Sequence, residues 1–135
     1  MQYWLLKTEP EEYSWEHLKK EKIGKWDGVA NAQAQKNLKS MKLGDLAFFY
    51  HTGKEKAIVG IVEICKEFYL PNKSSKLGQV DVKPYDAFEK SVTLAAIKEN
   101  ASLKTMKILR QPRLSVSTIT ESEFEEILRM SKNDE

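Results

Sequence analysis

The chain has 135 residues, of which 41% are apolar and 31% are charged, and its formal net charge at pH 7 is +2. A chain of this length can bury one core without metal ions or disulfides, and the single cysteine, Cys65, excludes an intrachain disulfide. The charge is too small to indicate nucleic-acid binding by itself. No signal peptide and no stretch near the ~20 apolar residues of a membrane span is evident. We therefore expect one cytoplasmic domain, residues 1–135, that acts as a monomer.

The start of the chain predicts a strand followed by a short helix. Residues 2–8 are mostly apolar and form the strand, which stops at Pro10 because proline cannot continue a hydrogen-bonded ladder. Ser14 provides the side-chain oxygen that caps a helix running to Lys20. Gly24 then ends this helical unit.

The middle of the chain predicts a helix and a hairpin. Asn31 caps a helix from Ala32 to Met41, in which apolar residues recur on one face. Residues 46–51 and 57–69 are β-rich and joined by a short polar connection, which predicts a hairpin. Apolar residues lie on both sides of the second strand, as in the centre of a sheet.

The second half continues the alternation of strands and helices. Residues 71–78 predict a loop, and residues 79–88 alternate as a strand. Further along we expect a helix capped by Thr93, a turn capped by Ser102, a basic loop at 110–113, a strand at 114–117, a helix capped by Thr120, and fraying over 131–135. Interspersed elements around a central hairpin predict the α+β class, with a small curved or barrel-like sheet flanked by helices.

The stretch from Trp26 to Asn31 is the main candidate for a binding site. Trp26 stands beside a carboxylate and a glycine in a predicted loop, where a large apolar side chain needs a reason. A flat aromatic face can stack on a nucleobase, although Trp26 can equally be a core residue. Asn31 can read a base edge through its amide, which is both donor and acceptor, or act only as the helix cap.

Two strand ends supply the other ligand-binding candidates. Lys7, Thr8 and Glu9 close the first strand, where they form either a solvated end or a polar pocket wall. Tyr50 and His51 close the aromatic strand and either line the pocket or belong to the core. A lone histidine is more often structural than catalytic, because a nucleophile needs a partnered base and an orienting group.

The remaining charged and metal-binding residue types carry less information. Arg110 and Arg113 lie in a basic segment and are the candidates for contact with phosphate. Two histidines and one cysteine make a zinc site unfavourable, and the scattered glycines form no phosphate-binding loop. We therefore expect no catalytic residue, no metal and no cofactor.

Several longer stretches resemble the EVE domain family in order and spacing, over nearly the whole chain. They are Trp4–Pro10 (WLLKTEP), Trp26–Val29 (WDGV), Asn31, Gln33, Ala34, Met41–Asp45 (MKLGD), Phe48–His51 (FFYH), Gly60–Ile61, Val80–Val82 (VDV) and Arg113–Val116 (RLSV). The resemblance implies a PUA-like fold, a compact β-barrel flanked by helices. The family is similar to the YTH domain, which holds a methylated adenine in an aromatic cage, and members are implicated in recognising modified cytosine in DNA.

This sequence departs from the family pattern in two places. Ala30, Ala32 and Gln35 stand where the family usually has arginine, tyrosine and a second arginine, so two cations and one aromatic are missing beside the pocket. Each lost cation removes roughly one phosphate contact. The segment from Tyr69 to Gln79 is also shorter than the usual family loop, which leads us to expect no lid or duplex-contacting wedge.

The resemblance and the residues together predict a non-enzymatic module that recognises a modified nucleobase, such as modified cytosine, in single-stranded or flipped-out DNA or RNA. In this hypothesis Trp26 stacks on the base and Lys7, Thr8 and Asn31 read its edge. One alternative is a small enzyme with His51 as general base. Another is a small-molecule or protein-interaction module whose nucleic-acid surface is reduced.

Overall fold

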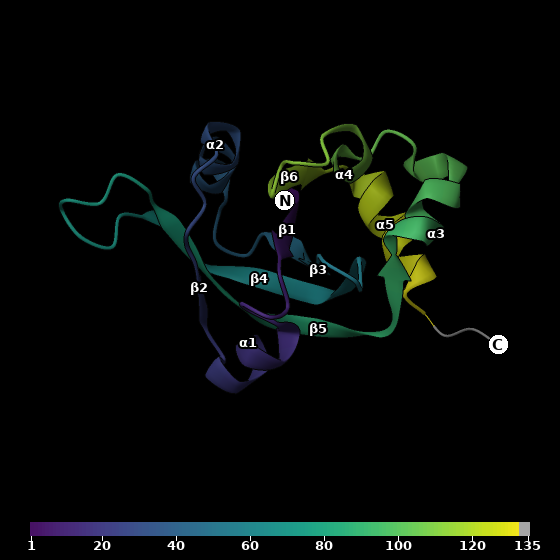
Figure 1. Cartoon of the computed structure of the whole chain (residues 1–135), viewed down its shortest axis with the longest axis horizontal. Coiled ribbons are helices and arrows are strands. Elements are labelled where there is room, and N and C mark those ends of the chain that lie inside the picture. The colour runs from purple at the N-terminus through teal and green to yellow at the C-terminus, as the bar shows by residue number, and fades with distance from the viewer. Residues whose placement is uncertain (133–135) are drawn as a thin grey trace.

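The computed structural model describes residues 1–132 and is built on one mixed sheet of six strands (Figure 1). The strands are β1 (Tyr3–Thr8), β2 (Gly24–Trp26), β3 (Leu46–His51), β4 (Ala57–Tyr69), β5 (Gln79–Thr93) and β6 (Val116–Ile119). The helices are α1 (Trp15–Glu21), α2 (Ala32–Ser40), α3 (Leu94–Glu99), the 3₁₀ helix η1 (Ala101–Leu103), α4 (Lys107–Arg110) and α5 (Glu121–Met130).

The sheet curls because its two longest strands are irregular. The strand order is β2-β5-β4-β3-β1-β6, and β1 and β3 are the parallel pair. The pairing of β4 with β5 shifts register at several points, including between Ile58 and Gly60 and between Ile64 and Lys66. Such bulges bend strands and increase their twist. The result is a half-barrel with β2 at one edge and β6 at the other, as the α+β, PUA-like prediction requires.

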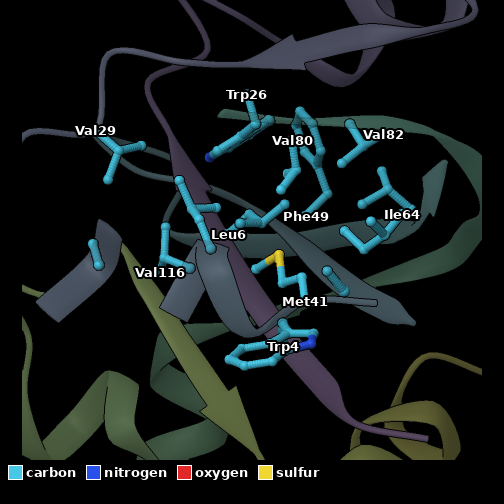
Figure 2. Close-up of a cluster of buried hydrophobic side chains, with 14 of the residues drawn as sticks. Trp4, Leu6, Trp26, Val29, Met41, Phe49, Ile64, Val80, Val82 and Val116 are labelled. Atoms are coloured by element: carbon cyan, nitrogen blue, oxygen red, sulfur yellow. The ribbon is translucent and has the colours of Figure 1, made fainter. Parts of the chain in front are cut away.

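Each face of the sheet buries its own hydrophobic cluster. The first cluster combines strand residues such as Leu6 and Phe49, which Figure 2 shows, with Trp15 of α1 and Leu38 of α2. The second combines the opposite sides of the same strands with apolar residues of α3, η1, α4 and α5. Strand side chains alternate between faces, which is why consecutive β3 residues enter different clusters.

The predicted hairpin and helix caps are confirmed. β3 pairs antiparallel with β4 from Leu46 to His51. The side chains of Ser14, Asn31, Thr93 and Thr120 each accept a hydrogen bond from the backbone N–H three residues later. These caps are local interactions, so the residue types alone identified them.

The role predicted for Gly24 is wrong. Helix α1 already ends at Glu21, and Gly24 begins the unpredicted strand β2, paired with Val82 of β5. A Cβ at Gly24 would lie 2.3 Å from the Tyr13 hydroxyl oxygen and 2.9 Å from a Leu18 methyl carbon. Glycine is therefore needed here for close approach of β2 to α1, not to stop the helix.

Other boundaries differ because pairing partners set them. β5 continues to Thr93 instead of Phe88, since it stays paired with β4 as far as Ala57. β6 covers Val116–Ile119 instead of 114–117, opposite β1. The turn before α4 is capped by Asn100 instead of Ser102, and α2 ends one residue before Met41. Fraying was expected over 131–135, but Ser131 is buried and hydrogen-bonded as the C-cap of α5, and residues 133–135 lie outside the described residues.

Candidate functional site

A polar cavity of about 670 Å³ lies between the ends of β1 and β2 and the connection from α4 to β6. The end of β1 forms one wall, the end of β2 and the segment after it form another, and the α4–β6 connection forms a third. The lining residues are Lys7, Thr8, Glu9, Glu12, Tyr13, Lys25, Trp26, Asp27, Gly28, Val29, Ala30, Thr52, Pro112, Arg113 and Ser115.

Trp26 lines this cavity but is mostly a core residue. It ends strand β2 instead of lying in a loop, and only 6% of it is exposed. Its ring packs edge-to-face on Phe49 at 5.5 Å and on Tyr13 at 6.1 Å between centroids. Trp26 is thus chiefly a packed residue of the first cluster, because alternation along β2 turns its ring inward, although part of the residue borders the cavity.

The indole nitrogen of Trp26 is the part of the ring that remains available for hydrogen bonding. The nitrogen-bearing end of the indole ring lies on the side of Val29, away from Val82 (Figure 2). This N–H has no hydrogen-bond acceptor among residues 1–132, although the nitrogen is not fully enclosed. Trp26 therefore borders the cavity and keeps one unused hydrogen-bond donor on the side of Val29, which also lines the cavity.

The polar end of β1 lies at the cavity as predicted from the sequence. Lys7 is half-buried, its Nζ donates to the Pro112 carbonyl at 2.7 Å, and burial lowers its pKa. The Thr8 hydroxyl donates to the Tyr13 carbonyl at 2.9 Å, so it can only accept a hydrogen bond from a ligand. Glu9 is exposed at the rim.

Tyr50 and His51 do not line the cavity. Tyr50 is buried in the second cluster, on the opposite face of β3 from Phe49. His51 is also buried; its Nε2 accepts from the Trp15 backbone N–H at 3.1 Å, and its Nδ1 lies 2.6 Å from Glu55 Oε1. Since Nε2 accepts, the proton is on Nδ1 and points to Glu55. The imidazole thus holds α1 against the β3–β4 turn.

The structure also separates the remaining candidates. Asn31 is exposed, and its Oδ1 accepts from the Ala34 N–H at 2.9 Å, so it serves as the α2 cap and does not line the cavity. Arg113 lines the cavity, whereas Arg110 ends α4 and lies outside the lining. Of the two predicted phosphate contacts, one is therefore at the cavity.

Sequence reasoning missed Tyr13 as the second aromatic of the site. No sequence pattern singled out Tyr13, whose ring meets that of Trp26 and lines the cavity. Its hydroxyl donates to Glu21 at 2.6 Å, and burial followed by this hydrogen bond raises its pKa. The spacing of Tyr13 and Trp26 carried no signal, because only the pairing of β2 with β5 brings Trp26 back to Tyr13.

The charges around the cavity balance. Three cationic side chains, Lys7, Lys25 and Arg113, share the lining with three carboxylates, those of Glu9, Glu12 and Asp27. Such a site attracts polyanions only weakly but supplies donors and acceptors for a polar ligand.

The part of the chain that the structure describes has neither a metal site nor a membrane-spanning helix. Within residues 1–132, no group of three His, Cys, Asp or Glu side chains is placed to hold a metal ion. No helix in the same part of the chain is long and apolar enough to cross a membrane. Cys65 is half-buried and free, and burial raises the pKa of its thiol.

Comparison with known proteins places this geometry in a family. Residues 2–130 match the EVE domain. Thymocyte nuclear protein 1 of Gallus gallus is 33% identical over 96% of this chain and 69% of its own length. The crystal structure of a protein from Agrobacterium tumefaciens is 38% identical, with a TM-score of 0.93 over 97% of this chain and 93% of the other.

A further solved relative contains a ligand. Human thymocyte nuclear protein 1, solved with DNA containing 5-methylcytosine, is 32% identical with a TM-score of 0.89, covering 100% of both chains. A YTH domain of Zygosaccharomyces rouxii, at 14% identity and a TM-score of 0.65 over 99% of this chain and 88% of its own, shares the fold. With the sequence match, the matching architecture and the cavity together, the chain belongs to the EVE domain family.

Proposed function

We propose that this chain is a non-enzymatic module that binds one modified nucleobase, such as a modified cytosine, in the cavity beside Trp26. The observation that carries the proposal is the match, over the whole of the solved chain, to a human relative solved with 5-methylcytosine-containing DNA. The cavity, at about 670 Å³, falls in the usual range of ligand pockets, roughly 300–1,000 Å³.

The cavity residues suit a flat polar ligand more than a strand of phosphates. Trp26 and Tyr13 supply aromatic edges, the Trp26 N–H and Lys7 supply donors, and the Thr8 hydroxyl supplies an acceptor. A base stacked inside a duplex cannot enter such a site, so it must be unpaired or flipped, and flipping costs a few kcal/mol. The module therefore prefers single strands or extruded bases.

Catalysis by His51 is not part of the proposal. Both nitrogens of its ring are engaged, by Trp15 and by Glu55, and the residue does not line the cavity. Covalent catalysis needs an activated nucleophile next to a base. The cavity lining includes neither histidine nor cysteine within the described chain, and its carboxylates stand without such a partner.

A binding titration tests the proposal. Labelled oligonucleotides of one sequence would be compared as single strands with 5-methylcytosine, single strands with cytosine, and the two corresponding duplexes. We expect the modified single strand to bind most tightly. Tighter binding of the unmodified duplex would rule the proposal out. Repeating the series in RNA distinguishes the two nucleic acids.

A further inference from the structure

The side chain of Gln35 joins the cavity wall to two other parts of the chain. It lies on α2 and is 9% exposed. Its Nε2 donates to the Val29 carbonyl at 2.8 Å and to the Gly78 carbonyl at 3.0 Å, and its Oε1 accepts from the Gly78 N–H at 3.1 Å. Both amide donors and one acceptor are thus used on backbone groups, so the side chain is held in one orientation.

The bond to Val29 fixes a peptide unit that borders the cavity. Val29 and Ala30 both line the cavity, and the peptide between them is trans. In a trans peptide the carbonyl and the following N–H point in opposite directions. Since Gln35 holds the Val29 carbonyl toward α2, the Ala30 N–H points the opposite way, and Ala30 itself is exposed and borders the cavity.

The backbone donors of this wall are unused. The N–H groups of Gly28, Val29 and Ala30 have no acceptor anywhere in residues 1–132. Gly28 has a positive φ of 70°, which turns the chain at this point. A segment of free backbone N–H groups beside a cavity is suited to a ligand that presents hydrogen-bond acceptors.

We propose that Gln35 is a positioning residue, which orients the Val29–Ala30 peptide so that the Ala30 N–H donates to an acceptor atom of the bound base. The carbonyl oxygen and unprotonated ring nitrogen of a pyrimidine are acceptors of this kind. This inference rests on the proposed function. It also gives Gln35 a role other than that of a lost cation, because an amide, unlike arginine, both donates to and accepts from the two segments that it joins.

Asn37 offers a matched control on the same helix. It is also 9% exposed, and its Nδ2 donates to the Val116 carbonyl at 2.7 Å, away from the Asp27–Ala30 wall. Gln35→Met removes the amide that pairs the Val29 carbonyl and both backbone groups of Gly78, whereas Asn37→Leu removes the amide that pairs the Val116 carbonyl. Both therefore lower the melting temperature, but only the first releases the peptide that borders the cavity.

The test compares two single-stranded probes, one with a single 5-methylcytosine and one with an abasic site at that position. For Gln35→Met we expect about tenfold weaker binding of the 5-methylcytosine strand, the effect of losing one well-made hydrogen bond, and unchanged binding of the abasic strand. Asn37→Leu should leave both affinities unchanged. In the wild type, the Ala30 amide resonance should shift and become protected from exchange when the 5-methylcytosine strand is added.

The outcomes separate this inference from the proposed function. Equal losses for Gln35→Met and Asn37→Leu, after correction for the folded fraction, would make Gln35 a purely structural residue while leaving base binding intact. A wild-type protein that does not distinguish the 5-methylcytosine strand from the abasic strand would overturn both proposals. If Gln35→Met does not fold, Ala30→Pro removes the N–H itself, and Ala30→Gly, which retains it, is the control.

Discussion

At the scale of single residues, Trp26 belongs to both the core and the cavity. It packs on Phe49 and Tyr13 with 6% of its surface exposed, while its indole N–H stays unpaired within residues 1–132. Trp4 of β1 is 3% exposed and donates through Nε1 to Asp45 at 3.0 Å. The two tryptophans are therefore alike in burial. Only a substitution of Trp26 that keeps an aromatic ring can change ligand binding without a large loss of stability.

For Trp26→Ala we expect a loss of about 3–5 kcal/mol in the free energy of unfolding, the cost of truncating a packed core aromatic. Trp4→Ala should cost as much or more, since it also leaves Asp45 without the indole donor. Chemical denaturation measures both. Trp26→Phe keeps a ring against Phe49 but lacks the N–H, so it should lose less stability while still weakening ligand binding. If the free energy of unfolding of Trp26→Ala were close to that of the wild type, the Trp26 ring would contribute little to packing.

At the scale of elements, α1 is held on the sheet by contacts that leave no spare space. A Cβ at Gly60 of β4 would lie 2.7 Å from the Trp15 ring and 2.9 Å from the Asp86 carbonyl oxygen. The Trp15 backbone N–H also donates to His51. The position of α1, and of Tyr13 before it, therefore depends on a glycine that no sequence pattern identified as a contact.

Gly60→Ala should destabilise the protein by about 1–3 kcal/mol, because the added methyl group forces α1 or β5 to move. Thermal unfolding monitored by circular dichroism measures the change. Trp15→Phe removes the ring atoms that the new Cβ meets, so the double variant should lose less stability than the two single effects added together. If the effects of Gly60→Ala and Trp15→Phe simply added, the added methyl group would be strained against the Asp86 carbonyl oxygen and not against the Trp15 ring.

Helix α5 is joined to the 3₁₀ turn by Glu126. Hydrogen bonds from Arg129 and from Asn100 lower the pKa of Glu126 to about 2 from the ordinary 4.5. A carboxyl whose folded-state pKa is depressed contributes stability above its unfolded pKa and loses it as the pH falls toward the folded value.

Between pH 4.5 and 2, the wild type should therefore lose a small contribution that Glu126→Gln lacks at every pH. Melting temperatures of the two proteins should differ most at neutral pH and converge near the lower limit. The effect is small because the carboxyl group is in contact with solvent. Parallel pH profiles would exclude this contribution of Glu126.

At the scale of the whole molecule, charge limits how nucleic acid can bind. The net charge is +2, and the cavity has three cationic and three carboxylate side chains. Each phosphate contact on a single strand contributes about −0.7 to the slope of log K against log salt. Three contacts thus predict a slope of about −2, shallow for a nucleic-acid-binding protein.

Arg113 and Arg110 test this limit as a matched pair. Arg113→Gln should make the salt slope shallower by about 0.7, since Arg113 lines the cavity. Arg110→Gln should change it less, because Arg110 lies outside the lining at the end of α4. Titrations at several salt concentrations measure the slopes. Equal changes would indicate that the strand crosses α4 as well as the cavity.

The sequence determined the features that depend on neighbouring residues or on the resemblance. The caps at Ser14, Asn31, Thr93 and Thr120, the hairpin of β3 and β4, and the α+β class follow from local hydrogen bonding and side-chain periodicity. Lys7, Thr8 and Glu9 line the cavity, which is one of the two alternatives that the sequence left open for this polar strand end.

Only the tertiary structure decided which side chains share the cavity. Tyr50 and Trp26 were expected together, but β3 turns Tyr50 to the other face, and pairing of β2 with β5 brings Trp26 to Tyr13 instead. Gln35 likewise meets Val29 and Gly78 only because α2 lies against the β4–β5 hairpin. Contacts between residues distant in sequence depend on strand order and curvature, which side-chain patterns along the chain do not encode.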